Sequence, residues 1–332
     1  MKISTSELKE KLKIVKTAIL PKSSNAALEC ALVRNGRIYG SNSLISISTP
    51  IDLDGEFLIP KRAMDIINCS HSADTEFSIT EKSLTVKFGN ATSRFPLLNT
   101  ADYIDIPSAV KNEWCKLPEE KISLIDDVAY ASALNDERPV YKSVLFDKEI
   151  VALDGVRAAV AKNGVDFRCI IPQIAFKAIS LLKGDNIRFT QEKSKLFFDD
   201  DNIAISVSGI SGEFMDYHKI IPELKYQFEI NRDELLEKLE IVNVATASNV
   251  KQSLKIQIKS NQLTMITTDS DISFEDTMPI DADFEFELKI NPKFLYDAVK
   301  SFKYDFVIKL SAPREPVVLE NEEQLAVIVP ML

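Results

Sequence analysis

The 332-residue chain has few of the residues on which most catalytic sites depend. It contains two histidines, four cysteines, nine glycines and one tryptophan. His71 and His218 are far from each other and from the cysteines in sequence, and no P-loop, HExxH, GxSxG or GxGxxG motif occurs. These absences argue against phosphate-cradling loops, a metal centre and a bound cofactor. The sequence therefore predicts a protein without catalytic activity.

Long apolar runs and paired cysteines are also missing. No stretch of about 18 apolar residues is present, and the start MKISTSELKE lacks the apolar core of a secretory signal. The cysteines are spaced without a CxxC pair, which favours free thiols in a reducing compartment. We therefore expect a cytoplasmic protein that does not interact with a membrane.

Positive charge is in deficit, with 40 basic against 50 acidic residues and a net charge of −10. This excludes a uniformly basic nucleic-acid binder but allows one basic face. The acidic stretches FFDDDN (197–202) and TTDSD (267–271) lack the ligand spacing of a calcium loop, so we expect turns and no metal. An enzyme with an unrecognised site at Asp199–Asp201 is one alternative.

One segment recurs three times along the chain. GEFLIPKRAMDIINCS, FRCIIPQIAFKAISLLKG and FELKINPKFLYDAVKSFK each run from a short apolar strand into a helical pattern opened by Pro60, Pro172 and Pro292. Each third of the chain also opens with an amphipathic helix, and Ser6 is the expected N-cap of the first. Repeats at this spacing predict three similar domains, residues 1–113, 114–222 and 223–332.

The segments between these helices alternate apolar and polar residues with a period of two. Examples are SLTVKF (83–88), NIAISVS (202–208), SLKIQIK (253–259), NQLTMIT (261–267) and DFEFELKI (283–290). Such alternation is typical of half-buried antiparallel strands. The predicted fold class is α+β, with two helices packed against antiparallel sheets of about eight strands in each domain.

Several of these segments, in this order, resemble the bacterial DNA polymerase III beta subunit, the sliding clamp. They are MKISTSELKEKLKIV at the start, SRFPLLNTADYIDIP (93–107), LDGVRAAVA (153–161), SGEFMDYHKIIP (211–222), INPKFLYDAV (290–299) and AVIVPML at the end. The chain resembles a short, divergent member. The resemblance implies that two copies, each with three clamp domains, pair head to tail into a six-domain ring. Helices would line a hole that encircles duplex DNA.

The implied function is that of a non-catalytic processivity factor. It would tether the replicative DNA polymerase to DNA without reading sequence, and a separate ATP-driven clamp loader would open it. The basic residues that the resemblance assigns to DNA contact are Lys13, Lys16, Lys22, Lys61, Arg62, Lys177, Lys183, Lys293 and Lys300. Periodicity alone allows a simpler interpretation, in which these residues form only the solvated faces of helices. Asp126 and Asp127, and Glu234 and Glu237, lie where a basic lining would be expected.

The resemblance also implies an apolar pocket for a linear peptide motif of partner proteins. Its residues would be Leu153, Gly155, Val156, Arg157, Ala158, Pro222, Asn291, Phe294, Val327, Ile328, Val329, Pro330, Met331 and Leu332. Arg157 and Asn291 would fix the direction of the peptide. The apolar end of the chain is also expected to be a final strand over 325–329, and the two interpretations share residues.

For the dimer interface, the resemblance implies that Arg94, Phe95 and Leu97 meet Ala245 and Thr246 of the other copy. The alternative function is a clamp-fold module that binds partner proteins without encircling DNA. A monomeric protein would favour that alternative.

Overall fold

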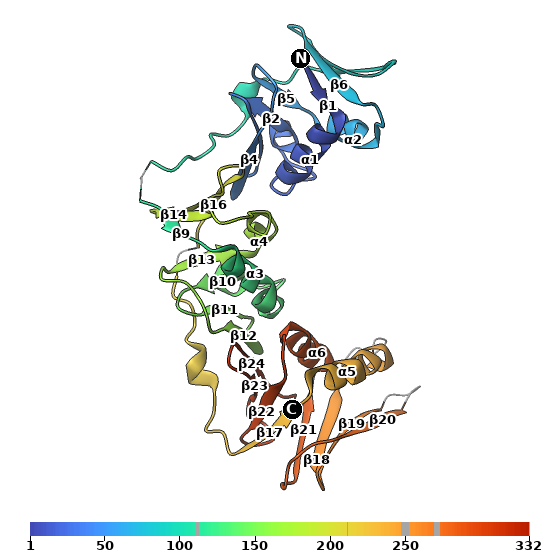
Figure 1. Ribbon diagram of the computed structural model, residues 1–332, viewed down its shortest axis with the longest axis vertical. Coiled ribbons are helices and arrows are strands. Elements are labelled where there is room, and N and C mark those ends of the chain that lie inside the picture. Colours follow the sequence, from blue (N-terminus) through green and yellow to red (C-terminus); the bar gives the residue numbers. More distant parts are fainter. Residues whose placement is uncertain (111–112, 211, 247–251, 269–272, 332) are drawn as a thin grey trace. The chain divides into compact units, whose positions relative to one another are not determined.

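The computed structural model describes residues 1–110, 113–210, 212–246, 252–268 and 273–331 (Figure 1). Within these residues each third of the chain contributes two α-helices and eight strands. This confirms the predicted α+β class and the number of elements in each repeat. No helix in the described part is long and apolar enough to cross a membrane. The boundaries of the three predicted domains stay a prediction.

The predicted proline-led helices are present. Pro60 is the N-cap of the second helix, Pro172 ends the strand directly before the fourth, and Pro292 is the first residue of the sixth. The helices are α1 (Thr5–Val15), α2 (Lys61–Cys69), α3 (Glu119–Val128), α4 (Gln173–Ile179), α5 (Arg232–Thr246) and α6 (Pro292–Ser301). The helices bury most of the apolar stripes expected from the sequence. The expected stripe of α2 was wrong at Ile66, which is 38% exposed, while Met64 is buried in its place.

The predicted N-cap of α1 is wrong. The helix begins at Thr5, and Ser4 occupies the N-cap position. Strand β1 (Lys2–Ser4) runs into the helix without a loop, and the Thr5 N–H donates to the carbonyl of Ala73 at 2.9 Å. Sheet pairing therefore fixes where this helix starts, and Ser6 lies within its first turn.

The chain divides into two compact units. Unit 1 comprises Met1–Ile122 and Ile174–Gly209, and unit 2 comprises Ser123–Gln173 and Ile210–Leu332. The middle third of the sequence therefore contributes strands to both units, through the sheets described next.

Unit 1 contains two antiparallel sheets. One has the order β1, β6 (Asp74–Ile79), β7 (Ser83–Phe88), β8 (Ala91–Pro96). The other has the order β5 (Phe57–Ile59), β2 (Ala31–Arg34), β3 (Arg37–Ser41), β4 (Ile45–Pro50), β16 (Ala204–Ser208), β15 (Lys195–Asp199), β14 (Arg188–Glu192), β9 (Cys115–Lys116). The stretch FFDDDN ends strand β15 at Asp199, and its last three residues lie in the predicted turn before β16. TTDSD lies largely outside the described residues.

Unit 2 repeats this arrangement. Its eight-stranded sheet has the order β13 (Cys169–Pro172), β10 (Ser143–Phe146), β11 (Ile150–Leu153), β12 (Arg157–Ala161), β24 (Gln324–Ile328), β23 (Val317–Glu320), β22 (Phe306–Leu310), β17 (Tyr226–Ile230). Its four-stranded sheet has the order β20 (Ser273–Pro279), β19 (Gln262–Thr268), β18 (Leu254–Lys259), β21 (Phe286–Ile290). The predicted final strand is β24.

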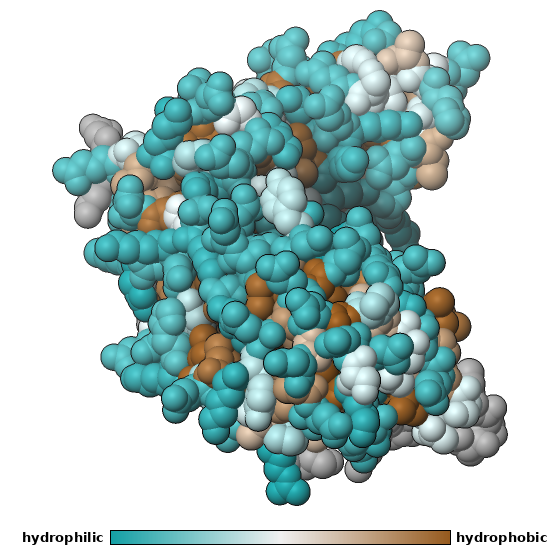
Figure 2. Space-filling view, turned by 60° about the horizontal axis from the view of Figure 1, so that its bottom comes forward, coloured by the Kyte–Doolittle hydropathy of each residue, from teal (hydrophilic) through white to brown (hydrophobic). Residues whose placement is uncertain are grey.

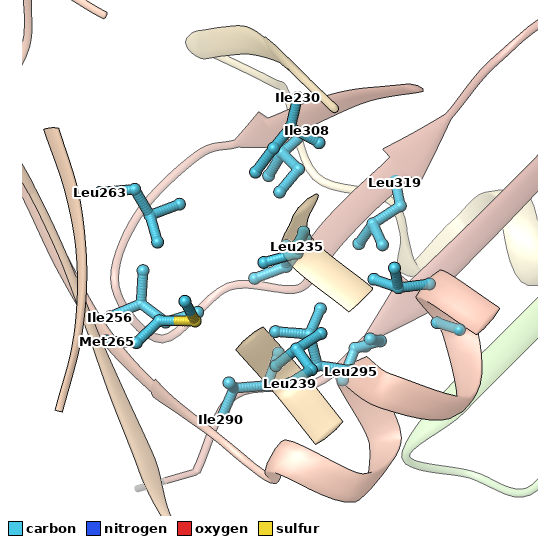
Figure 3. Close-up of a cluster of buried hydrophobic side chains, with 14 of the residues drawn as sticks. Ile230, Leu235, Leu239, Ile256, Leu263, Met265, Ile290, Leu295, Ile308 and Leu319 are labelled. Atoms are coloured by element: carbon cyan, nitrogen blue, oxygen red, sulfur yellow. The ribbon is translucent and has the colours of Figure 1, made fainter. Parts of the chain in front are cut away.

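One hydrophobic core joins α5, α6 and both sheets of unit 2 (Figure 3). Leu235 and Leu239 of α5 and Leu295 of α6 lie among Ile256 and Met265 of the four-stranded sheet. Ile308 and Leu319 of the eight-stranded sheet belong to the same cluster. The helices therefore bury their stripes against both sheets.

Replacing Leu239 with alanine tests this core. Leu239 is fully buried, so Leu239→Ala is expected to lower the free energy of unfolding by about 2–5 kcal/mol. The exposed neighbour Glu237 gives the matched control, Glu237→Ala. Urea titration followed by circular dichroism measures both, and equal midpoints for the two variants would contradict the placement of Leu239.

Candidate functional site

The predicted peptide pocket centres on the turn between β11 and β12. The Asp154 carboxylate accepts hydrogen bonds from the N–H groups of Val156 at 3.1 Å and Arg157 at 3.0 Å. Gly155 has a φ of 92°, which favours glycine at this position. This side-chain-capped turn presents Val156 to solvent, with 43% of its surface exposed.

The C-terminal segment extends the sheet beside this turn. Strand β24 pairs antiparallel with β12, with Arg157 opposite Ile328. The pairing continues past the strand, because the Val329 N–H donates to the Val156 carbonyl at 2.9 Å. Further on, the Met331 N–H donates to the Lys289 carbonyl of β21 at 2.8 Å. The end of the chain is thus fixed between two sheets of unit 2, and Leu332 lies outside the described residues.

The predicted pocket residues separate onto the two faces of the eight-stranded sheet, because alternate residues of a strand point to opposite sides. On one face, Leu153, Ala158 and Val327 share a buried cluster. Ile220, Ile221 and Leu224, which surround the half-buried Pro222, pack against that cluster. On the other face, Ile328 belongs to the core of α5 and α6, against which Phe294 packs. The structure therefore brings together one apolar wall rather than the whole predicted set.

Val156 and Val329 are the exposed part of this wall. They are opposite each other in the strand register, and 37% of Val329 is exposed. Pro330 beside them is buried, and Met331 is half-buried. We call Val156 and Val329, with Leu153, Ala158 and Val327 buried behind them, the apolar groove, after the peptide pocket that the sequence predicts at this place. An exposed apolar surface beside a strand end suits an extended peptide with large apolar side chains.

The two predicted polar residues already have partners within the chain. Arg157 forms ion pairs with Asp154 at 2.9 Å and Asp297 at 3.0 Å, and its guanidinium lies 4.5 Å from the centre of the Phe294 ring. The Asn291 side chain accepts from the Lys293 N–H at 2.9 Å and so caps α6. These contacts hold the turn against α6, and a direct role in fixing the peptide stays a prediction.

A charge cluster supports the far end of the β12–β24 pair. Lys162 and Lys309 donate to the Glu320 carboxylate at 2.5 and 2.6 Å. Burial opposes ionisation of Glu320, but the two lysines outweigh it and hold its pKa below its ordinary value. Because its pKa is lowered, ionised Glu320 stabilises the fold at pH values above 4.5, the ordinary pKa of a glutamate side chain. This stabilisation is lost as the pH falls below that value and the carboxylate takes up a proton.

Replacing Glu320 with glutamine tests this cluster. Glu320→Gln is expected to lower the free energy of unfolding at pH 7 by about 1 kcal/mol and to flatten its fall between neutral and acid pH. The exposed Glu322 supplies the control, Glu322→Gln. Urea titrations at a series of pH values measure both effects. An unchanged pH dependence in Glu320→Gln would contradict the assignment.

The predicted DNA-contacting residues are exposed, except Lys16, which is half-buried. Three of them pair with carboxylates of their own unit: Lys16 with Asp65 at 3.2 Å, Lys183 with Glu119 at 3.0 Å and Lys293 with Asp297 at 3.0 Å. Lys61 donates to the Pro21 carbonyl at 2.8 Å, which holds the start of α2 to the loop that carries Lys22. In the described part of the chain Lys13, Lys22, Arg62 and Lys177 make no ion pair, so their charges are available.

The predicted dimer residues differ in exposure. Arg94, Phe95 and Leu97 lie on or beside β8, an edge strand of its sheet, and Arg94 is exposed. Ala245 and Thr246 are buried at the end of α5, where the Thr246 hydroxyl donates to the Val242 carbonyl at 2.9 Å. The same helix instead exposes Ile241 and Val244, at 49% and 80%. Sequence reasoning missed these two residues.

Exposed apolar side chains can indicate where a partner binds when they lie next to one another. Figure 2 shows a face on which hydrophilic residues predominate and hydrophobic ones form small separate groups. Scattered single apolar residues are ordinary on a surface, whereas adjacent ones beside a groove or an open sheet edge indicate binding. Val156 with Val329, and Ile241 with Val244, are such pairs.

The chain is similar to known clamp proteins along its length. Residues 226–327 match the model of the DNA polymerase III beta subunit, N-terminal domain. This model describes an N-terminal domain, yet it matches the last third of the present chain. Such a match is expected if the chain repeats one kind of domain. The beta sliding clamp of Helicobacter pylori strain J99 is 21% identical over 294 residues, which cover 79% of this chain and 75% of that protein.

Solved structures agree with the sequence comparison. The DNA polymerase sliding clamp from Bacillus subtilis superposes with a TM-score of 0.90 at 18% identity, over 100% of this chain and 98% of that one. The Helicobacter pylori beta clamp bound to a DNA ligase peptide superposes with a TM-score of 0.86 at 17% identity, over 100% and 99%. The resemblance predicted from the sequence is therefore confirmed: residues 226–327 match the model of a DNA polymerase III beta subunit domain, and the chain has the fold of the bacterial beta sliding clamps.

Proposed function

We propose that this chain is a sliding clamp, a processivity factor that encircles duplex DNA and tethers a DNA polymerase to it. The observation that carries the proposal is the superposition from end to end on bacterial sliding clamps, at a TM-score of 0.90 over 98% of the Bacillus subtilis chain. The protein has no catalytic activity of its own and works in the cytoplasm. Its three clamp domains are residues 1–113, 114–222 and 223–332.

The ring forms from two copies that meet head to tail. Strands β8 and β20 are each an edge strand of one four-stranded sheet, and both are long enough to pair with another strand. The edge of β21 differs, because Met331 already donates to it. Phe95 of β8 and Leu97 just after it would meet Ile241 and Val244 of α5, which packs on β19 and β20. Ala245 and Thr246 support that surface from beneath.

DNA contact is electrostatic and independent of base sequence. The candidate residues lie mainly on the helices, and Lys13, Lys22, Arg62 and Lys177 have unpaired charges in the described structure. Lysine and arginine side chains that meet phosphates through such contacts exchange easily, which suits sliding. The ion-paired Lys16, Lys183 and Lys293 would have to give up their carboxylate partners to join them.

Partner proteins dock at the apolar groove. The Helicobacter pylori clamp binds a DNA ligase peptide. In this chain Val156 and Val329 offer an exposed apolar surface for a motif of a replicative polymerase or an ATP-driven clamp loader. Buried Leu153, Ala158 and Val327 lie behind this surface. Pro222 lies in the segment that borders it.

A primer-extension assay tests the proposal. A bacterial replicative polymerase extends a primed single-stranded circle in the presence of a clamp loader and ATP, with and without this protein. We expect long products only when the protein is present. Product lengths that do not change on its addition, at concentrations where a Bacillus subtilis clamp lengthens them, would contradict the proposal.

A second candidate is a clamp-fold module that binds partner motifs without encircling DNA. The observation that favours it is the acidic character of two helices: α3 carries Asp126 and Asp127, and α5 carries Glu234 and Glu237. Such a protein would bind the ligase peptide as a monomer and would leave the product lengths unchanged.

A further inference from the structure

The β12–β24 junction that carries the apolar groove has a counterpart in unit 1, where β4 pairs with β16 (Figure 1). Asn42 there takes the place of Asp154. Its side-chain oxygen accepts from the N–H groups of Leu44 at 2.8 Å and Ile45 at 3.0 Å. The Ser208 N–H donates to the Leu44 carbonyl at 2.7 Å, as Val329 does to Val156. Leu44, like Val156, is exposed, at 51%.

The side chains at matching positions are chemically different. Counted from these shared hydrogen bonds, the buried apolar residues Leu153, Ala158 and Val327 correspond to Ser41, Ser46 and Ser206. The same backbone junction is therefore lined by hydroxyls in unit 1 and by apolar groups in unit 2. A peptide that suits one junction would leave its polar or apolar groups unmatched in the other.

A cavity of about 580 Å³ lies along the β4–β16 junction. Its lining includes Arg37 of β3, Ser46 and Ser48 of β4, Ser206 of β16 and the indole of Trp114. A smaller volume of about 70 Å³ shares Ser46 and Ser206 with it and extends to Leu44 and Lys195. The two together are lined by hydroxyl, basic and apolar side chains of unit 1, the apolar ones including Ile47, Phe197 and Ile205, and we call this site the serine groove.

Two basic side chains of the serine groove, Arg37 and Lys195, form no ion pair with a carboxylate in the described part of the chain. Arg37 donates only to neutral oxygens, the Ser48 hydroxyl and carbonyl at 3.2 Å and the Asn202 carbonyl at 3.3 Å. The Asp199 carboxylate is already bound to Arg188 at 2.7 Å, which leaves Asp105 as the unpaired acidic group of the lining.

Arg34 adds a further positive charge to this lining. Its guanidinium reaches Glu56 at 2.8 Å through one nitrogen, while its Nε is buried without a hydrogen-bond partner. A buried donor without a partner costs free energy, so Arg34 contributes its charge to the lining rather than an accessible Nε donor. The groove is therefore rich in basic side chains on a chain whose net charge is −10.

We propose that the serine groove binds a short acidic peptide segment of a protein partner. Carboxylates of the segment accept hydrogen bonds from Arg37 and from the hydroxyls of Ser46, Ser48 and Ser206. The indole of Trp114 offers an apolar surface to the methylene groups of its side chains. This second docking site selects a different chemistry from the apolar groove.

Tryptophan fluorescence tests the proposal directly, since Trp114 is the single tryptophan of the chain. The full-length protein is titrated with hexaglutamate peptide. We expect a saturable change in Trp114 emission, and about tenfold weaker binding in Arg37→Gln, which removes a charged hydrogen-bond donor. Arg314→Gln removes the same charge at an exposed site and should bind like the unaltered protein.

A second variant guards against misfolding of Arg37→Gln. Lys195 is exposed, so Lys195→Gln should keep the fold and still weaken hexaglutamate binding. No saturable signal up to about 1 mM peptide, or equal affinity in Arg37→Gln and Arg314→Gln, would overturn the proposal. Tighter binding of a thymidine hexanucleotide than of hexaglutamate would also overturn it, in favour of nucleic acid. Val329→Asp should leave hexaglutamate binding unchanged, which separates this site from the apolar groove.

Discussion

Replacing Val329 with aspartate is expected to weaken binding of a DNA ligase peptide, of the kind bound by the Helicobacter pylori clamp, by about 100-fold. Val329 lies at the exposed end of the apolar groove, opposite Val156 and next to buried Val327. A carboxylate at this position would have to lose water when an apolar peptide side chain docks against it, without gaining a partner. Fluorescence anisotropy of a labelled peptide measures the affinity.

The fold should tolerate this change, since 37% of Val329 is exposed and its backbone N–H bond to Val156 is kept. Val244→Asp is the matched control, because it places the same charge on an exposed apolar residue of α5. Its peptide affinity should equal that of the unaltered protein. Equal affinity in Val329→Asp and the unaltered protein would show that the peptide binds elsewhere.

Replacing Val244 with aspartate is expected to convert the proposed dimer into a monomer, with association weakened by about 100-fold or more. Val244 is 80% exposed on α5, next to the open edge strand β20, and a dimer interface would bury it. A buried carboxylate without a partner opposes association strongly. Light scattering across a concentration series measures the molar mass, which should be twice 37.2 kDa for the unaltered protein.

Val329→Asp now serves as the control and should remain dimeric. A mass near 37.2 kDa for the unaltered protein at every concentration would contradict ring formation and favour the partner-binding module. A dimer that survives Val244→Asp would move the interface away from α5, and Arg94 and Phe95 of β8 would then be the next residues to replace.

Local patterns in the sequence predicted most of the elements. The period-two segments became strands, with β7 over Ser83–Phe88 as expected, and the three prolines marked the starts of α2, α4 and α6. These features depend on neighbours within a few residues, and a sequence shows such neighbours directly. Ser6 shows the limit even at this scale, because pairing of β1 with β6 set the start of α1.

The pairing of strands that are far apart in the chain could not be predicted from local sequence patterns. The junctions β4–β16 and β12–β24 join strands far apart in the chain, and they decide which residues share a face. For that reason Leu153 and Arg157 were expected in one pocket, although they lie on opposite faces of a sheet. The burial of Arg157 between Asp154 and Asp297 depends on the same long-range contacts.

The sequence contained a signal that would have improved the predicted dimer residues, namely the helical spacing of the apolar residues in α5. Leu239 and Val242 belong to the buried stripe of α5, and Thr246 continues that stripe at helical spacing. The exposed face of the helix therefore falls on Ile241 and Val244, one turn before the end. Helical phase alone would have moved the expected contact from Thr246 to Val244.

Retention on circular DNA tests the central claim most directly. A clamp loader and ATP place the protein on nicked circular duplex DNA, and the complex is then washed in high salt, which removes contacts that depend on charge alone. A ring that encircles DNA should stay on the circle and leave within minutes when the circle is cut once. Loss from the uncut circle in high salt, or equal retention on cut and uncut DNA, would contradict the account.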